Sequence, residues 1–147
     1  MKNDADFEQL FSTMMQFGKL MSQQTQEDHE EKKATMLQLT ALQFLKEEPR
    51  GTVSGLANFL KLSKSSATQL IERLVKVGLI ERINDQEDRR IIRLIITESG
   101  EREFVTLRKK LMEKIQMIFS KIPTKDLKDL TRIYANLLET LTKEHNE

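Results

Sequence analysis

The sequence predicts a mainly α-helical chain with one small β-hairpin, and three observations support this fold class. Gly and Pro number only 5 and 2 among the 147 residues, which favours long, uninterrupted helices. Apolar residues recur at spacings of three and four along most of the chain, as they do on one face of a helix. Between residues 79 and 97 the pattern changes to β-branched runs around a charged turn, which is typical of two strands.

The N-terminal third predicts two helices separated by a polar loop. The first is expected to begin at Asp6, and its apolar stripe consists of Phe7, Leu10, Phe11, Met14, Phe17 and Met21. The polar stretch Gln23–Glu31 predicts the end of this helix and a loop. Thr35–Gln38 has the pattern of a capping box and predicts the start of the second helix. Its buried face is expected to contain Leu39, Leu42, Phe44 and Leu45.

Two short helices joined by a turn of three or four residues are predicted next. The longer helix that begins at Thr35 is expected to end at Glu48–Gly51, since Pro disfavours helix in the residue before it and Gly turns freely. Thr52 or Ser54 then caps the first short helix, and Ser63 caps the next one. The inward side of that helix is expected to consist of Ala67, Leu70, Ile71, Leu74 and Val75. Two helices joined in this way are the signature of a helix-turn-helix.

A hairpin follows the helix-turn-helix directly. Lys76–Gly78 ends the preceding helix with a cation and a glycine, as helix C-termini prefer. Leu79–Ile83 and Ile91–Thr97 predict the two strands, and Asn84–Asp88 predicts the charged turn between them. A hairpin in this place is a wing, so residues 35–97 are interpreted as a winged helix-turn-helix.

Long helices with apolar stripes are predicted at both ends of the chain. A helix is expected from Glu98 to the break at Ile122–Pro123, and a last one from about Thr124. Their stripes contain Phe104, Leu107, Leu111, Ile115 and Ile118, and then Leu127, Leu130, Tyr134, Leu137 or Leu138, and Leu141. We interpret residues 1–34 and 98–147 as dimerisation helices of a homodimer. The alternative is that these helices cover one another within one chain.

Charge is unevenly distributed along the sequence. Residues 50–97 hold 9 Lys and Arg against 5 Asp and Glu, a net charge of +4. Residues 1–49 hold 5 against 9, a net charge of −4, and residues 98–147 hold 10 against 9, a net charge of +1. A phosphate backbone attracts a local basic patch rather than an average charge, so double-stranded DNA is the expected partner. The alternative is chance clustering on a solvated surface.

The order of these motifs resembles the MarR family of bacterial and archaeal regulators over about residues 7–141. The most specific match consists of Gly78–Arg82, the wing segment Asp85–Arg90, and the closing segment Leu94–Thr97 with Gly100. The segment Leu62–Thr68, followed by Leu70 and Arg73, is similar to the family's recognition helix. Two positions depart from the family pattern: Lys61 and Gln86 stand where Gly and Pro are frequent.

Polar side chains are frequent at the start of the candidate recognition helix, which Ser63 is expected to cap. Short hydroxyls and an amide can reach base edges or phosphates without blocking insertion into the major groove. We expect DNA contacts from Ser63, Lys64, Ser65, Ser66, Thr68, Gln69 and Arg73. Helix capping and a solvated face are the alternative for the same residues.

In the wing, the resemblance implies that Arg90 enters the minor groove and that Asp88 holds or orients it. Arg is favoured in narrow A·T-rich minor grooves, and a neighbouring carboxylate can orient a guanidinium through a bidentate pair. Arg89 and Arg82 are expected to reach phosphates. A surface ion pair worth about 0–1 kcal/mol is the alternative.

The resemblance also implies a ligand-responsive repressor that binds pseudo-palindromic operators as a homodimer. Its effector would be a small phenolic or other aromatic compound bound between the dimer helices and the winged unit. Several methionines could supply an adaptable lining, although ordinary core is the alternative: Met14, Met15, Met21, Met36, Met112 and Met117. The sequence assigns no ligand-binding residue.

Other function classes find little support. The chain has no Cys and only two His, His29 and His145, and it lacks a Gly-rich phosphate loop and an HExxH motif. No enzyme activity, metal site or cofactor is therefore expected. No apolar run approaches 18 residues, so no membrane contact is expected, and the absence of Cys suits a cytoplasmic protein. The main alternative function is a winged-helix protein-interaction module that does not bind DNA.

Overall fold

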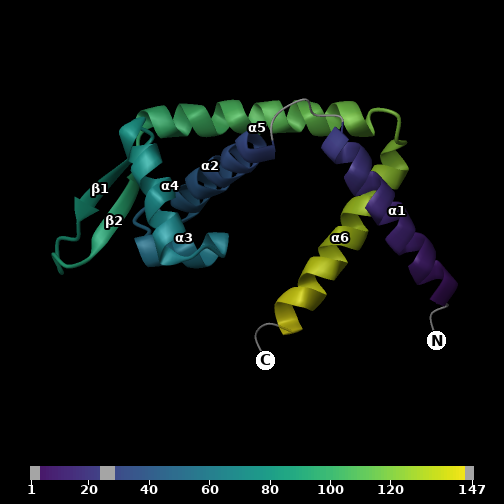
Figure 1. Ribbon diagram of the computed structural model, residues 1–147, viewed down its shortest axis with the longest axis horizontal. Helices are drawn as coiled ribbons and strands as arrows, with labels where there is room; N and C mark the ends of the chain where they lie inside the picture. The colour runs from purple at the N-terminus through teal and green to yellow at the C-terminus, as the bar shows by residue number, and fades with distance from the viewer. Residues whose placement is uncertain (1–3, 24–28, 145–147) are drawn as a thin grey trace. The chain divides into compact units, whose positions relative to one another are not determined.

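A computed structural model describes residues 4–23 and 29–144, and the structural statements below refer to these residues. They form six helices and one antiparallel hairpin, as the fold class predicted (Figure 1). Along the chain the elements are α1 (Asp4–Gln23), α2 (His29–Glu47), α3 (Val53–Leu60), α4 (Lys64–Lys76), β1 (Ile80–Asn84), β2 (Ile92–Ile96), α5 (Glu98–Phe119) and α6 (Thr124–Glu144). The chain divides into two compact units, residues 1–100 and residues 101–147.

The hydrophobic core lies in the first unit, where α2, α3, α4 and the hairpin contact one another (Figure 1). The largest fully buried side chains come from all of these elements: Leu42, Leu45, Leu56, Ile71, Leu74, Ile80 and Leu94. Each contributes about 1.5–3 kcal/mol through burial. The predicted buried face of α2 is confirmed, whereas Val75 in α4 is 37% exposed and was predicted wrongly. Val75 lies at the edge of a narrower buried stripe formed by Ala67, Leu70, Ile71 and Leu74.

The start of α2 differs from the prediction. The helix begins at His29, so Thr35 lies inside it and the predicted capping box is wrong. Residues 29–31 are helical rather than part of a loop, while residues 24–28 lie outside the described part of the chain. Residues 30–34 are Glu, Lys and Ala, which have high helix propensity, so the helix continues through the expected cap.

The helix-turn-helix has caps at its predicted positions. Thr52 caps α3, since its Oγ1 accepts a hydrogen bond of 3.0 Å from the backbone N–H of Gly55. Lys61 follows α3 in the left-handed conformation, with φ 54° and ψ 39°, and the Leu62 N–H donates to the Ala57 carbonyl at 2.9 Å. Lys61 therefore occupies a position that favours glycine, at a cost of about 1–2 kcal/mol.

The hairpin is fixed to the helices at two places. The backbone N–H of Leu94 donates to the Gly51 carbonyl at 2.8 Å, so β2 is joined to the loop between α2 and α3. At the other end, the Thr97 hydroxyl donates to the Gly78 carbonyl at 2.6 Å and accepts from the Gly100 N–H at 3.0 Å. A Cβ atom at Gly100 would collide with the Leu79 carbonyl, which explains the glycine there.

The terminal helices expose large apolar side chains. In α1 these side chains are 49–64% exposed: Phe7, Leu10, Phe11, Met14, Met15, Phe17 and Leu20. The exposed apolar side chains of α6 are Leu127, Ile133, Tyr134, Leu137, Leu138 and Leu141. Met14, Met15, Met36, Met112 and Met117 are likewise exposed in the single chain, which does not support ordinary core for these five. None of the described helices combines the length and apolar character that crossing a membrane requires.

Candidate nucleic-acid interface

Three hydroxyl groups at the start of α4 are already engaged within the helix. Ser63 caps α4, since its Oγ accepts from the Ser66 N–H at 3.1 Å. The Ser63 hydroxyl also donates to the Ser66 Oγ at 2.9 Å. The Thr68 hydroxyl donates to the Lys64 carbonyl at 2.8 Å. For Ser63, Ser66 and Thr68, helix capping and local bonding account for the hydroxyl contacts within the free protein.

Four other predicted contact residues of α4 have exposed side chains: Lys64, Ser65, Gln69 and Arg73. In the described part of the chain these side chains make no hydrogen bond or ion pair. Ser65, Gln69 and Arg73 are spaced by four residues, so they follow one another along a single helix face. That row of unpaired polar groups is the side of α4 that is free to bind a ligand.

A groove runs beside this face of α4 within the first unit. Its apolar part is formed by Leu37 of α2 together with Leu62 and Leu70. Its polar part is formed by Ser66, Gln69, Glu72, Arg73 and Lys76. Arg73 and Gln69 therefore border both the open surface of α4 and this groove.

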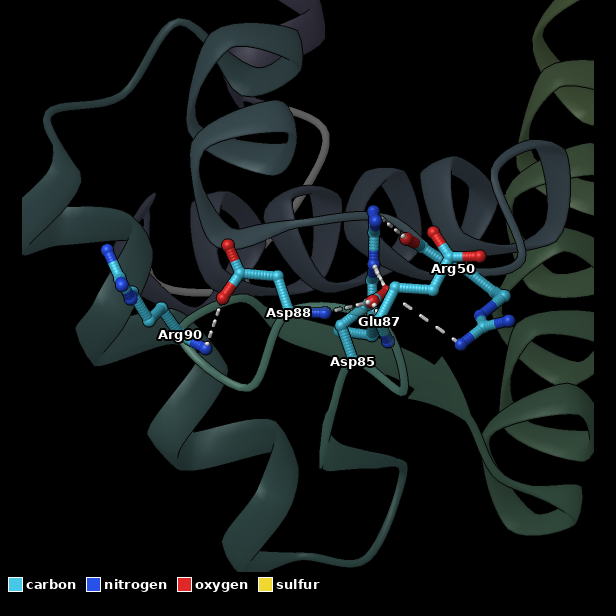
Figure 2. Close-up of polar contacts among 6 residues, drawn as sticks. Arg50, Asp85, Glu87, Asp88 and Arg90 are labelled. Atoms are coloured by element: carbon cyan, nitrogen blue, oxygen red, sulfur yellow. Dashed lines mark hydrogen bonds and ion pairs between the residues drawn. The ribbon is translucent and has the colours of Figure 1, made fainter.

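The wing loop is closed by hydrogen bonds at its base. The Asp85 N–H donates to the Ile91 carbonyl at 2.8 Å, and the Ile91 N–H donates to the Asp88 carbonyl at 2.9 Å. The Asp85 Oδ1 accepts from the backbone N–H groups of Glu87 and Asp88, at 2.9 and 3.1 Å. The loop is thus held by its own backbone and by one carboxylate (Figure 2).

Among the described residues, Asp85 is the one charged residue that is buried, with 8% of its surface exposed. Its Oδ2 accepts from the Arg93 Nε–H at 2.7 Å, and an Arg50 guanidinium nitrogen lies 3.9 Å away. The hydrogen bond from Arg93, followed by the Asp88 and Glu87 N–H groups, lowers the pKa of Asp85 to about 2. Asp85 is therefore ionised at neutral pH.

The predicted wing contacts Arg82, Arg89 and Arg90 are exposed. Their guanidinium groups make no ion pair within the described residues, and Figure 2 shows the Arg90 side chain pointing away from Asp85. The Asp88 Oδ1 accepts from the Arg90 backbone N–H at 3.0 Å. Asp88 thus contacts the main chain of Arg90, and the bidentate pair considered from the sequence is absent from these residues.

Asp85 and Arg93 were missed as site residues by sequence reasoning. An Asp followed by a short polar turn is a signal for side-chain bonds to the next backbone N–H groups, and it could have indicated Asp85. Arg93 carried no such signal. Its NH1 donates to the Arg50 carbonyl at 3.1 Å, and that partner lies 43 residues away in the sequence.

Comparisons with known proteins agree with the fold and with these motifs. The family model described as MarR family matches residues 34–92. The uncharacterized HTH-type transcriptional regulator YpoP of Bacillus subtilis is 32% identical over 107 residues, which cover 73% of this chain and 76% of YpoP.

Solved structures show the same fold. The crystal structure of a MarR family transcription regulator superposes with a TM-score of 0.74 at 19% identity, covering 98% of this chain and 97% of the other. The structure of YusO from Bacillus subtilis superposes with a TM-score of 0.69 at 25% identity, covering 90% of this chain and 96% of YusO. On the family match, the identity to YpoP and the winged architecture together, the chain belongs to the MarR family and is a DNA-binding transcription regulator.

Proposed function

We propose that this protein is a ligand-responsive repressor that binds pseudo-palindromic operators in the cytoplasm as a homodimer. One observation carries the proposal. The winged unit, residues 35–97, presents unpaired polar and basic side chains on both α4 and the wing, with Gln69 and Arg90 as examples. Such groups are the ones that bind base edges and phosphates. They also argue against a module that binds only proteins.

The contacts of α4 divide into two kinds. Ser65 and Gln69 are uncharged, exposed and unpaired, so we assign them to base edges in the major groove, where a Gln pairs well with adenine. Lys64 and Arg73 are assigned to phosphates. Ser63, Ser66 and Thr68 act mainly by shaping the helix N-terminus, whose backbone N–H groups favour a phosphate.

The wing supplies the second set of contacts. Arg90 is assigned to the minor groove, and Arg82 and Arg89 to the flanking phosphates. Their exposure and lack of ion-pair partners within the described residues support this assignment, since each guanidinium can bind DNA without breaking a contact. Asp88 is assigned to the Arg90 main chain through their 3.0 Å hydrogen bond.

Residues 1–34 and 98–147 are proposed to form the dimer interface. The apolar side chains of α1 and α6 that are exposed in one chain would be buried between two chains. A two-fold dimer then presents two α4 helices to a pseudo-palindrome. Leu138→Glu should yield monomers in sedimentation, while Lys128→Glu on the same helix should not. A Leu138→Glu protein that remains a dimer would contradict this interface.

The effector is proposed to be a small phenolic or other aromatic compound. Exposed methionines support such a ligand, because Met can supply an adaptable apolar lining: Met14, Met15, Met36, Met112 and Met117. Titrating the protein–operator complex with simple phenols and aromatic acids tests this proposal. If none of these compounds releases the DNA at millimolar concentration, the proposed effector class is contradicted.

A salt titration of DNA binding tests the proposed function as a whole. The DNA is the region upstream of the protein's own gene, with a scrambled duplex of the same composition as the control. We expect tight, salt-dependent binding to the first duplex and weaker binding to the second. Equal and salt-independent binding, or no binding, would favour the protein-interaction module instead.

A further inference from the structure

We propose that Asp85, Arg93 and the main-chain carbonyl of Arg50 form a wing anchor that fixes the wing loop to the loop between α2 and α3. By fixing that loop, the wing anchor determines where Arg90 meets the minor groove. The inference rests on the proposed function of the wing. It assigns Asp85 and Arg93 as positioning residues, because they act on DNA through Arg90.

The wing anchor joins the wing loop and β2 to the loop between α2 and α3, which is distant from them in the sequence. Arg93 lies on β2, and its guanidinium donates in two directions: from Nε to Asp85 at 2.7 Å, and from NH1 to the Arg50 carbonyl at 3.1 Å. Asp85 in turn accepts from the N–H groups of Glu87 and Asp88 in the wing loop. Figure 2 shows the Asp85 carboxylate at the centre of these contacts.

A continuous series of hydrogen bonds leads from Arg93 to Arg90. The Asp85 carboxylate holds the Asp88 N–H, and the Asp88 carboxylate holds the Arg90 N–H. The Arg90 backbone is thereby positioned while its guanidinium stays exposed. Since a guanidinium reaches only as far as its backbone allows, a displaced wing loop would move Arg90 relative to the groove.

Positioning explains this ion pair better than stability alone. Burying a carboxylate and a guanidinium carries a desolvation cost that their attraction only partly offsets, so such pairs are weak evidence for stability. The Arg93 side chain remains 28% exposed, whereas the Asp85 side chain is only 10% exposed. The two-directional geometry also requires an arginine, because a lysine ammonium lacks the planar arrangement of donors that contacts both oxygens.

The neighbouring hollow does not indicate a bound ligand in place of the wing anchor. Its lining mixes both signs of charge: Glu48, Pro49, Arg50, Asp85, Gln86, Glu87 and Arg93. Two of its lining residues, Asp85 and Arg93, already form an ion pair with one another. The contacts therefore point to a structural connection between the wing and the helices.

A double-mutant cycle with Arg90 tests the inference on the full-length chain. Operator affinity is measured for the parent, Arg93→Met, Arg90→Ala and the double variant. If Arg93 acts through Arg90, Arg93→Met should weaken binding about tenfold in the parent and less than about twofold when Arg90 is already Ala. Losses that multiply in the double variant would overturn the inference, because they would indicate a direct DNA contact or a general loss of fold.

Two further variants separate the parts of the wing anchor. Asp85→Asn keeps one oxygen for the loop N–H groups but loses the charge facing Arg93, so it should behave like Arg93→Met. Arg50→Met is the matched control. It removes a 55% exposed guanidinium that lies 3.9 Å from Asp85 and keeps the carbonyl, so it should change affinity by less than about threefold. An Arg50→Met loss as large as that of Arg93→Met would contradict the proposed contacts.

Amide hydrogen exchange in the free protein gives a readout that does not depend on DNA. Arg93→Met and Asp85→Asn should accelerate exchange at the Glu87, Asp88 and Arg90 amides, while core amides of α4 exchange as in the parent. Unchanged exchange in the wing loop would overturn the wing anchor even if the DNA contact is correct. Parent-like operator affinity of Arg90→Ala would instead overturn the proposed wing contact.

Discussion

The two parts of the candidate interface, α4 and the wing, are held in place by different kinds of contact. The start of α4 is organised by bonds between residues three or four apart, such as those from Ser66 to Ser63 and from Thr68 to Lys64. The wing loop depends on Arg93, whose contact with the Arg50 carbonyl spans 43 residues. Local bonds alone organise the start of α4, whereas the wing loop combines local bonds to Asp85 and Asp88 with a connection, through Arg93, to a loop that is distant in the sequence.

The largest expected effect belongs to the wing. Arg90→Ala should remove one minor-groove contact from each half of a two-fold complex. At roughly 1–3 kcal/mol for each contact, the operator affinity should fall by about 2–6 kcal/mol. Fluorescence anisotropy with operator and scrambled DNA measures this loss, and circular dichroism checks the fold. If Arg90→Ala binds its operator as tightly as the parent, the assignment of Arg90 to the minor groove is wrong.

Asp88→Ala should cost less than Arg90→Ala. It deletes the 3.0 Å hydrogen bond to the Arg90 backbone but leaves the guanidinium in place. A hydrogen bond of this kind contributes about 0.5–1.5 kcal/mol, or about 1–3 kcal/mol over two subunits. The same anisotropy assay ranks the two variants. A larger loss for Asp88→Ala than for Arg90→Ala would mean that Asp88 itself contributes more than orientation.

In α4, Lys64→Ala should weaken binding to all sequences alike. The exposed Lys64 ammonium makes no ion pair within the described residues, and we assign it to a phosphate. Removing one phosphate contact per subunit should lower the slope of log affinity against log salt by about one unit per site. Glu72→Ala, on the same helix, is the matched control and should not lower this slope. Loss of binding to the operator alone would assign Lys64 to a base instead.

Lys61→Gly should stabilise the free protein with little change in operator affinity. Lys61 occupies the left-handed region at φ 54°, where glycine has no Cβ penalty. The expected gain is about 1 kcal/mol, measured by urea denaturation. Lys76→Gly, in the last turn of α4, serves as the contrast and should destabilise. A destabilised Lys61→Gly protein would show that the Lys61 side chain makes a contact worth more than the backbone strain.

The free energy of unfolding should depend on pH through the carboxylate of Asp85 in the wing. The pKa of Asp85 is lowered from its ordinary value of 3.8 to about 2, so the folded state favours the ionised form. This contribution is present above about pH 4 and is lost as the pH falls towards 2. Thermal melts of the parent and Asp85→Asn between pH 2 and 6 should therefore converge at the acid end. A constant difference between the two proteins over that range would contradict this assignment.

Local signals predicted most of the fold. Ser63, Gly78 and the apolar face of α2 are determined by neighbours in the sequence, and the structure places them as expected. The start of α2 was missed because Thr35–Gln38 satisfies a capping pattern that a longer run of helix-forming residues overrides.

The sequence predicted those residues of the candidate site whose role depends on their neighbours in the sequence. The exposed residues of α4 and of the wing tip followed from residue type and motif. Asp85 and Arg93 did not, because their importance comes from a contact with the loop before α3 that only the folded chain brings together. The sequence also favoured a pair between Asp88 and the Arg90 guanidinium, because it could not show whether the side chain or the backbone N–H of Arg90 donates to the Asp88 carboxylate.

Dimethyl sulfate footprinting on the operator tests most directly whether α4 and the wing contact DNA together. The reagent modifies N7 of guanine in the major groove and N3 of adenine in the minor groove, so one experiment reports on both elements. We expect two protected half-sites about 10–10.5 base pairs apart, or a multiple of that spacing, with N7 protected within each half-site and N3 protected beside it. At a protein concentration that restores saturation of the operator, Arg90→Ala should keep the N7 protection and lose the N3 protection. Protection of N7 alone in the parent, or of neither position, would contradict the account.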